Sequence, residues 1–104
     1  MSFDQHEQQY DVLMQLEALI FVSDAPVSLA RLKEAFQGQY TKLQLRELLQ
    51  QLAILQHVRS IELMETAEGY RFQVRAKYRN MITQTWPERP IKLSPSLLET
   101  VAVI

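Results

Sequence analysis

The sequence predicts a mainly helical domain with one small β-hairpin, an α+β arrangement of the winged helix-turn-helix class. Two observations carry this prediction. Apolar residues recur at helical spacing in three successive segments before residue 59, and their period changes to two after it. Three helices followed by a hairpin is the order typical of winged helix-turn-helix domains.

The first helix, expected from Tyr10 to Val22, is apolar around most of its circumference. Within this segment only Asp11, Gln15 and Glu17 are polar. One apolar face is enough to pack a helix against a core, so a surface this wide needs cover on two sides. That cover comes either from the same domain or from a partner, and the sequence leaves both open.

The second and third helices begin at recognisable caps. Ser28 precedes a short apolar pattern that Gly38 ends, and Thr41 with Gln44 forms a capping box for the next helix. The third helix then carries a stripe of leucines that we expect to face the core: Leu45, Leu48, Leu49, Leu52 and Leu55.

The hairpin is expected from Ile61 to about Val74, with its turn at residues 66–69. Gly69 supplies a residue that can take a positive φ in this turn. Arg71 and Arg75 fall on the outer face of the second strand, where Glu62 on the first strand is expected to pair with them.

The residues after the hairpin indicate how the chain divides into domains. We expect an N-terminal winged-helix domain over residues 1–86, closed by a short helix from Lys77 to Trp86, then a linker over residues 87–92. Trp86 is expected to wedge the linker against a domain. Residues 93–104 read as the start of a second winged-helix domain that is truncated here. Ser94 can cap its first helix with Pro95 at the first helical position, and that helix stops in its apolar middle.

Composition excludes several classes of function. The 104 residues contain no cysteine and carry a formal net charge of -1, which excludes disulfides, thiolate metal sites and a generally basic DNA-coating protein. Gly38 and Gly69 stand too far apart to form a phosphate-binding loop. His6 and His57 lack a second ligand at metal spacing. We therefore expect no catalytic, cofactor or metal site, no membrane association, and a cytoplasmic protein.

The third helix would read DNA if this module bound it, but its outer face is poorly suited to phosphate. One cation and one anion share it with glutamines and two hydrophobic residues, and the wing tip carries Glu65 and Glu68. Duplex binding typically neutralises about 6 to 10 phosphates. Lys42 and Arg46 are the candidate nucleic-acid contacts, and we expect DNA binding to be indirect or weak. The outer-face residues are Leu43, Arg46, Glu47, Gln50, Gln51 and Ile54.

Four blocks of sequence resemble the N-terminal half of the segregation and condensation protein B (ScpB) family, in that family's order and approximate spacing. The combination is specific, although each block alone is weak. The blocks are Leu16-Glu17-Ala18-Leu19-Ile20-Phe21 with Pro26-Val27-Ser28-Leu29; Gly69-Tyr70-Arg71-Phe72; Arg89-Pro90; and Leu93-Ser94 with Leu98-Glu99-Thr100.

The resemblance implies a non-enzymatic, dimeric adaptor of the bacterial Smc-kleisin condensin complex, which acts in chromosome condensation and segregation. Its expected partners are a second copy, the kleisin ScpA and, through ScpA, the Smc heads, on the nucleoid. Candidate interface residues are Val12, Met14 and Leu19 on the first helix, outside its core face, with Leu43 and Ile54 as a second choice. The alternative is a dimeric winged-helix transcription regulator that binds DNA.

Overall fold

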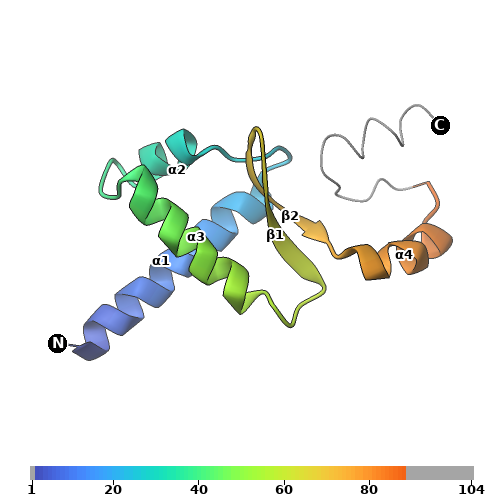
Figure 1. Cartoon of the computed structure of the whole chain (residues 1–104), viewed down its shortest axis with the longest axis horizontal. Coiled ribbons are helices and arrows are strands. Elements are labelled where there is room, and N and C mark those ends of the chain that lie inside the picture. The colour runs from blue at the N-terminus through green and yellow to red at the C-terminus, as the bar shows by residue number, and fades with distance from the viewer. Residues whose placement is uncertain (1, 89–104) are drawn as a thin grey trace.

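The computed structural model describes residues 2–88, with side chains from residue 8 onward. It confirms the mainly helical α+β arrangement with one two-stranded antiparallel hairpin (Figure 1). The elements are α1 (Ser2–Val22), α2 (Leu29–Ala35), α3 (Lys42–Leu55), β1 (Ile61–Thr66), β2 (Gly69–Val74), the 3-10 helix η1 (Ala76–Tyr78) and α4 (Arg79–Thr85). The expected second-domain start at 93–104 and most of the expected linker lie outside the described residues.

Helix α1 begins earlier than the apolar pattern predicts, at Ser2 instead of Tyr10. The added turns contain glutamine and glutamate, which have good helix propensity but give no apolar periodicity. Along α1, Leu13, Leu16 and Ile20 are buried, which is one helical face. The domain therefore covers one side of this apolar helix.

The predicted caps are confirmed. The Ser28 hydroxyl accepts from the Arg31 amide at 3.1 Å. The Thr41 hydroxyl accepts from the Gln44 amide at 3.1 Å, while the Gln44 side chain accepts from the Thr41 amide at 2.9 Å, which completes a capping box. Between α2 and α3 the backbone turns through Gln37 and Gly38, both at positive φ.

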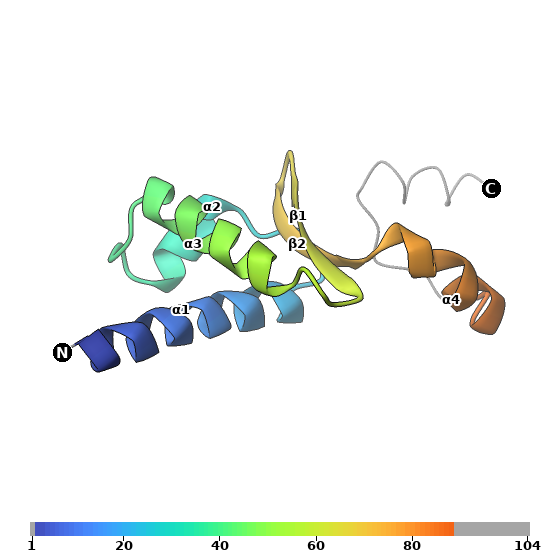
Figure 2. The same cartoon turned by 60° about the horizontal axis from the view of Figure 1, so that its bottom comes forward.

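The core lies where α1, α2 and α3 meet one face of the hairpin (Figures 1 and 2). Leucines dominate it. In α3, Leu48 is only slightly more exposed than the other buried leucines of the predicted stripe. Leu55, which was expected to join that stripe, is 41% exposed, so the buried stripe ends at Leu52. The most deeply buried side chains are Leu16, Leu32, Leu45, Leu49 and Leu52.

The hairpin also pairs with a third backbone segment, at Val27 in the connection between α1 and α2. Val27 and Tyr70 exchange two backbone hydrogen bonds, each of 2.8 Å. Gly69 sits beside this bridge with φ of +144°, and a Cβ added there would lie 2.4 Å from the Val27 carbonyl carbon and oxygen. Glycine is therefore required both for the backbone conformation and for the close approach.

Helix α4 and η1 together correspond to the short helix predicted from Lys77 to Trp86. They extend away from the body formed by α1 to α3 and the hairpin, as both views show (Figures 1 and 2). No residue of α4 is buried. Trp86, at the end of this helix, is 49% exposed.

Candidate interaction surfaces

The candidate residues on α1 differ in how far the domain covers them. Val12 and Met14 are half-buried and pack against the core, so only part of each side chain is available to a partner. Leu19 is 37% exposed and borders a groove of about 460 Å³ between α1 and α2, which Val27, Leu32 and Ala35 also line. Among these three α1 positions, Leu19 offers the clearest contact for a second molecule.

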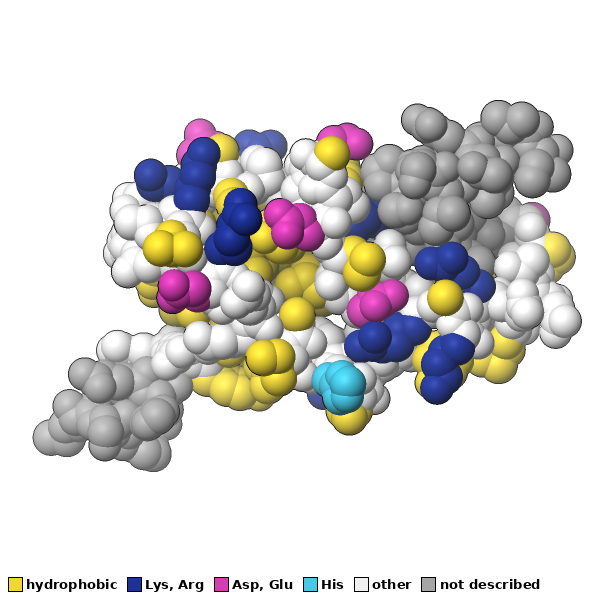
Figure 3. Space-filling model, viewed as in Figure 1, with side chains coloured by type: hydrophobic (Ala, Val, Ile, Leu, Met, Phe, Trp, Pro, Cys, Tyr) yellow, Lys and Arg dark blue, Asp and Glu magenta, His cyan; other side chains and the backbone are white. Residues whose placement is uncertain are grey.

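On α3, Leu43 and Ile54 are 66% and 72% exposed. Eleven residues separate them, which is close to three helical turns, so they lie on one side of the helix. Arg46, Glu47 and Gln50 are exposed between them. Figure 3 shows this face of the molecule, where hydrophobic, basic and acidic side chains are interspersed. A surface of this kind suits contact with protein better than contact with a run of phosphates.

Arg46, one of the two candidate nucleic-acid contacts, and the hairpin residue Glu65 both act on Tyr70. Tyr70 is buried beside Glu65. Burial is the main cause that raises the pKa of the Tyr70 hydroxyl, and the Glu65 carboxylate raises it further, while the Arg46 charge lowers it. Glu65 is also the cross-strand neighbour of Tyr70. Glu65 and Arg46 therefore act on the Tyr70 hydroxyl with opposite sign, whereas Lys42 is exposed at the start of α3.

Arg75 has a structural role that the sequence predicts only in part. The predicted pairing with Glu62 is confirmed at 3.3 Å. The same guanidinium also donates to the carbonyl oxygens of Arg59 at 2.6 Å and Gln56 at 2.7 Å. A cation that donates to carbonyls at the C-terminal end of α3 also interacts favourably with the helix dipole. Arg75 therefore fixes the hairpin against α3.

Arg71 does not share the Glu62 contact. Its Nε is buried without a hydrogen-bond partner, and within residues 8–88 the only ion pair is that between Arg75 and Glu62. The expectation that Glu62 pairs with both arginines is therefore wrong for Arg71. In the register Glu62 lies opposite Gln73, with Arg71 and Arg75 two residues to either side, and its carboxylate pairs only with Arg75.

The described part of the chain has neither a metal-ligand cluster nor a membrane-spanning helix. It contains no cluster of three or more His, Cys, Asp or Glu side chains that could hold a metal ion. Nor does it contain a helix that is both long and apolar enough to cross a membrane. The exposed features that remain are the α1–α2 groove, the outer face of α3 and the projecting α4.

Comparison with known proteins decides the family. The family model described as segregation and condensation complex subunit ScpB matches residues 14–104, which is most of the chain. The chain belongs to the ScpB family. The resemblance found in the four sequence blocks is thereby confirmed, and the chain carries the signature of a chromosome segregation and condensation subunit.

Two curated ScpB relatives match over 91 residues. The chain is 34% identical to the segregation and condensation protein B homolog of Coxiella burnetii and 32% identical to segregation and condensation protein B of Syntrophotalea carbinolica. Each match covers 86% of this chain but only 44% and 45% of the respective relatives. The chain therefore spans a little under half the length of these ScpB proteins.

Solved structures agree with this assignment. ScpB from Mycobacterium tuberculosis superposes with a TM-score of 0.68 at 30% identity, over 91% of this chain and 60% of that one. A conserved hypothetical protein from Chlorobium tepidum gives 0.70 at 30% identity, over 78% of this chain and 51% of that one. The arrangement of helices and hairpin described above is thus found in a solved ScpB structure.

Proposed function

We propose that this protein is a non-enzymatic adaptor that forms a homodimer and binds the kleisin ScpA, and through ScpA the Smc heads, on the nucleoid in the cytoplasm. Membership of the ScpB family supports a role in chromosome segregation and condensation. The observation that carries the adaptor mechanism is the exposed face of α3, where Leu43 and Ile54 flank a mixture of charges. A helix with this face is suited to binding protein.

For the contact between two copies, we propose the surface of α1 around Leu19, with Val12 and Met14 at its edge. The groove beside Leu19 is lined by Val27, Leu32 and Ala35 together with Arg31 and Glu34. An apolar floor with one cation and one anion at its rim can accept the same surface of a second copy in a two-fold arrangement. Leu43 and Ile54 are the second candidate for contact between copies or with a partner.

The alternative, a dimeric winged-helix transcription regulator, draws its support from Lys42 and Arg46 on α3. Against it stands the hairpin tip, because the Glu65 carboxylate lies near Tyr70, whose hydroxyl also senses the charge of Arg46. Phosphate would meet this carboxylate. We therefore assign DNA at most an indirect or weak contact with this domain.

Isothermal titration calorimetry of the purified protein against the central segment of its own kleisin tests this proposal. The mass of the protein is measured by light scattering in the same buffer. Saturable binding by a dimer is the expected result. Absence of heat at tens of micromolar, with binding to duplex DNA that weakens steeply as salt rises and is lost in a Lys42→Ala, Arg46→Ala double variant, would favour the regulator.

A further inference from the structure

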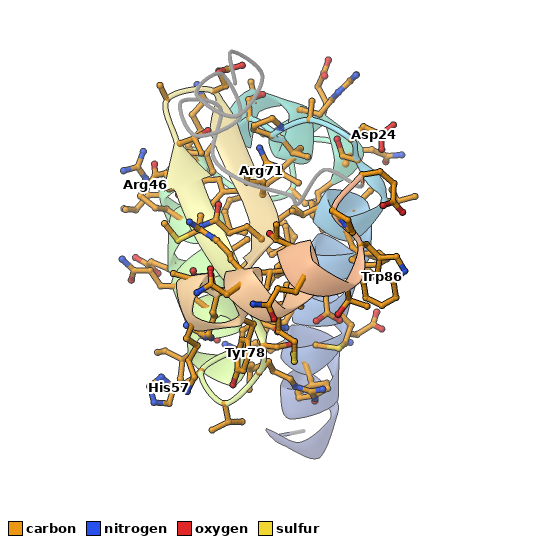
Figure 4. The ribbon with its side chains drawn as sticks, turned by 90° about the vertical axis from the view of Figure 1, so that its right-hand side faces the viewer. Asp24, Arg46, His57, Arg71, Tyr78 and Trp86 are labelled. Carbon is orange, nitrogen blue, oxygen red and sulfur yellow. The ribbon has the colours of Figure 1, made fainter. Side chains whose placement is uncertain are left out.

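Helix α4 is the most exposed regular element of the described chain. It has seven residues, none of them buried, and among the described elements it packs chiefly against the adjoining η1. Met81 is 62% and Trp86 49% exposed, while Tyr78 and Ile82 are half-buried. Met81 and Ile82 lie in α4, Tyr78 is its N-cap and Trp86 its C-cap, so spacings of three and four residues bring apolar side chains to successive positions along the helix. Figure 4 looks onto this end of the molecule and shows Tyr78 and Trp86 beside α4.

A helix this short needs support from outside itself. Isolated helices below about 12 residues are marginal in water even with favourable sequences. Helix α4 has no side-chain cap at its N-terminus, and at its end the Thr85 hydroxyl donates to the Met81 carbonyl at 2.8 Å. The apolar side of α4 is therefore the part of the described domain that gains most from being covered.

The charge around α4 is strongly one-sided. No Asp or Glu occurs between Gly69 and Pro87, whereas this stretch contains four cations: Arg71, Arg75, Lys77 and Arg79. Arg75 is engaged with Glu62 and the α3 carbonyls. In the described structure the other three make no ion pair, and the Nε atoms of Arg71 and Arg79 lack a hydrogen-bond partner. Figure 3 shows Lys and Arg side chains gathered where the hairpin meets α4.

We propose that α4 and its flanking cations form the docking surface for an acidic, amphipathic segment of the partner protein. Apolar side chains of that segment pack on Met81 and Trp86, and its carboxylates pair with Lys77 and Arg79. The inference rests on the proposed function, because it takes the partner to be the kleisin. Charge complementarity selects this occupant. A second copy would place the same cations opposite one another. Three cations without an ion pair, one of which (Lys77) lies over the Tyr78 ring at 5.3 Å, fall short of what a duplex requires.

Trp86 allows a direct test, because it is the only tryptophan in the chain. The central kleisin segment, with any tryptophan replaced by phenylalanine, is titrated into the full protein while tryptophan emission is recorded. Docking on α4 removes water from the half-exposed indole, so emission should move to shorter wavelength and saturate at the affinity that calorimetry gives. Unchanged emission during calorimetrically saturable binding would overturn the α4 assignment and leave the proposed function intact.

Two variants sharpen the test. Met81→Glu should weaken kleisin binding at least about tenfold, the effect expected for losing a central apolar contact. Lys77→Glu should also weaken kleisin binding, and the loss should be larger at low salt than at high salt. Lys33→Glu on α2, at the opposite end of the domain, is the matched control for charge and should bind like the wild type. Circular dichroism checks that every variant folds, which is expected because neither Met81 nor Lys77 is buried.

The remaining outcomes also decide the matter. Full affinity in Met81→Glu, with loss in Leu43→Glu, would move the docking surface to α3 and overturn the inference. Conversion of the Met81→Glu protein from dimer to monomer would assign α4 to contact between copies and would overturn it as well. Absence of any kleisin binding by the wild type would contradict the proposed function itself, and the α4 assignment with it.

Discussion

Helices α3 and α4 are built in opposite ways. Helix α3 has 14 residues, a reciprocal capping box at its start, the Arg75 guanidinium at its end and four buried leucines. Helix α4 has seven residues, no side-chain cap at its start and no buried residue. Contacts within the domain stabilise α3 along its length, whereas few such contacts stabilise α4. Substitutions of the buried residues of α3 and of its caps should therefore change stability, and substitutions in α4 should change binding.

The largest loss of stability is expected from a substitution on the buried side of α3. Leu49→Ala should lower the free energy of unfolding by about 3 kcal/mol, because Leu49 is 1% exposed and the lost side chain leaves a cavity. Urea unfolding followed by circular dichroism measures this. Leu43→Ala on the exposed side of the same helix is the control, with an expected change within about 0.5 kcal/mol. Equal losses from both variants would contradict the proposed division of α3 into buried and exposed sides.

The next largest loss is expected for Gly69→Ala, which should lower the free energy of unfolding by about 2 kcal/mol or more. The new Cβ would meet the Val27 carbonyl at 2.4 Å, and φ of +144° is strained for any residue with a side chain. Gly38→Ala is the matched control, because Gly38 also has a positive φ but nothing lies within 4 Å of the position that a Cβ would take there. Its cost should be about 1 kcal/mol. Thermal denaturation of both variants compares them, and a smaller loss at Gly69 than at Gly38 would refute the close approach.

Removing the Arg75 guanidinium should cost about 1.5 kcal/mol, since Arg75→Met leaves the carbonyls of Gln56 and Arg59 without this donor while keeping most of the side-chain volume. Arg71→Met, on the same strand face, should change stability by less than about 0.5 kcal/mol. The denaturant midpoints of the two variants give the comparison. Equal midpoints would show that Arg75 does not connect the hairpin to α3.

Tyr70 should make stability fall at alkaline pH. Its pKa is raised in the folded protein, by burial and by Glu65, so folding favours the neutral hydroxyl. The stabilisation is complete below the ordinary tyrosine pKa of about 10 and is lost as pH rises through the higher folded pKa. Unfolding midpoints measured at about pH 8 and about pH 11 should differ less in Tyr70→Phe than in the wild type. An identical pH dependence in both proteins would rule out this contribution.

The smallest effect on stability should come from α4. Met81→Ala is expected to change the free energy of unfolding by less than about 0.5 kcal/mol, because Met81 is 62% exposed. Urea unfolding of the free protein measures it beside Leu49→Ala. A loss comparable to that of Leu49→Ala would mean that the domain itself depends on α4, and the contrast between the two helices would disappear.

Sequence reasoning predicted the local features of this fold well. The caps at Ser28 and Thr41 and the turn at Gly69 are each determined by a few neighbouring residues, and all three were confirmed. The Glu62–Arg75 pair followed from strand alternation alone. Features that depend on the meeting of distant segments were missed, as with the Val27–Tyr70 bridge and the bonds from Arg75 to the carbonyls of Gln56 and Arg59.

The candidate surfaces were predicted less completely. Leu43 and Ile54 were identified because a helix with a leucine stripe must expose its other side. Val12 and Met14 were placed outside the core face, yet they pack partly against the core, because side chains flanking a buried stripe are reached by neighbouring elements. The exposure of α4 could not be foreseen, since its sequence shows an apolar pattern but not whether the domain covers it.

Hydrogen exchange measured by mass spectrometry, on the protein alone and with the central kleisin segment bound, tests the contrast between α3 and α4 most directly. The account predicts slow exchange in α3 in both states, and exchange in α4 that is fast in the free protein and slows when the kleisin binds. Protection of α4 equal to that of α3 in the free protein, or no change in α4 on saturation with kleisin, would contradict it.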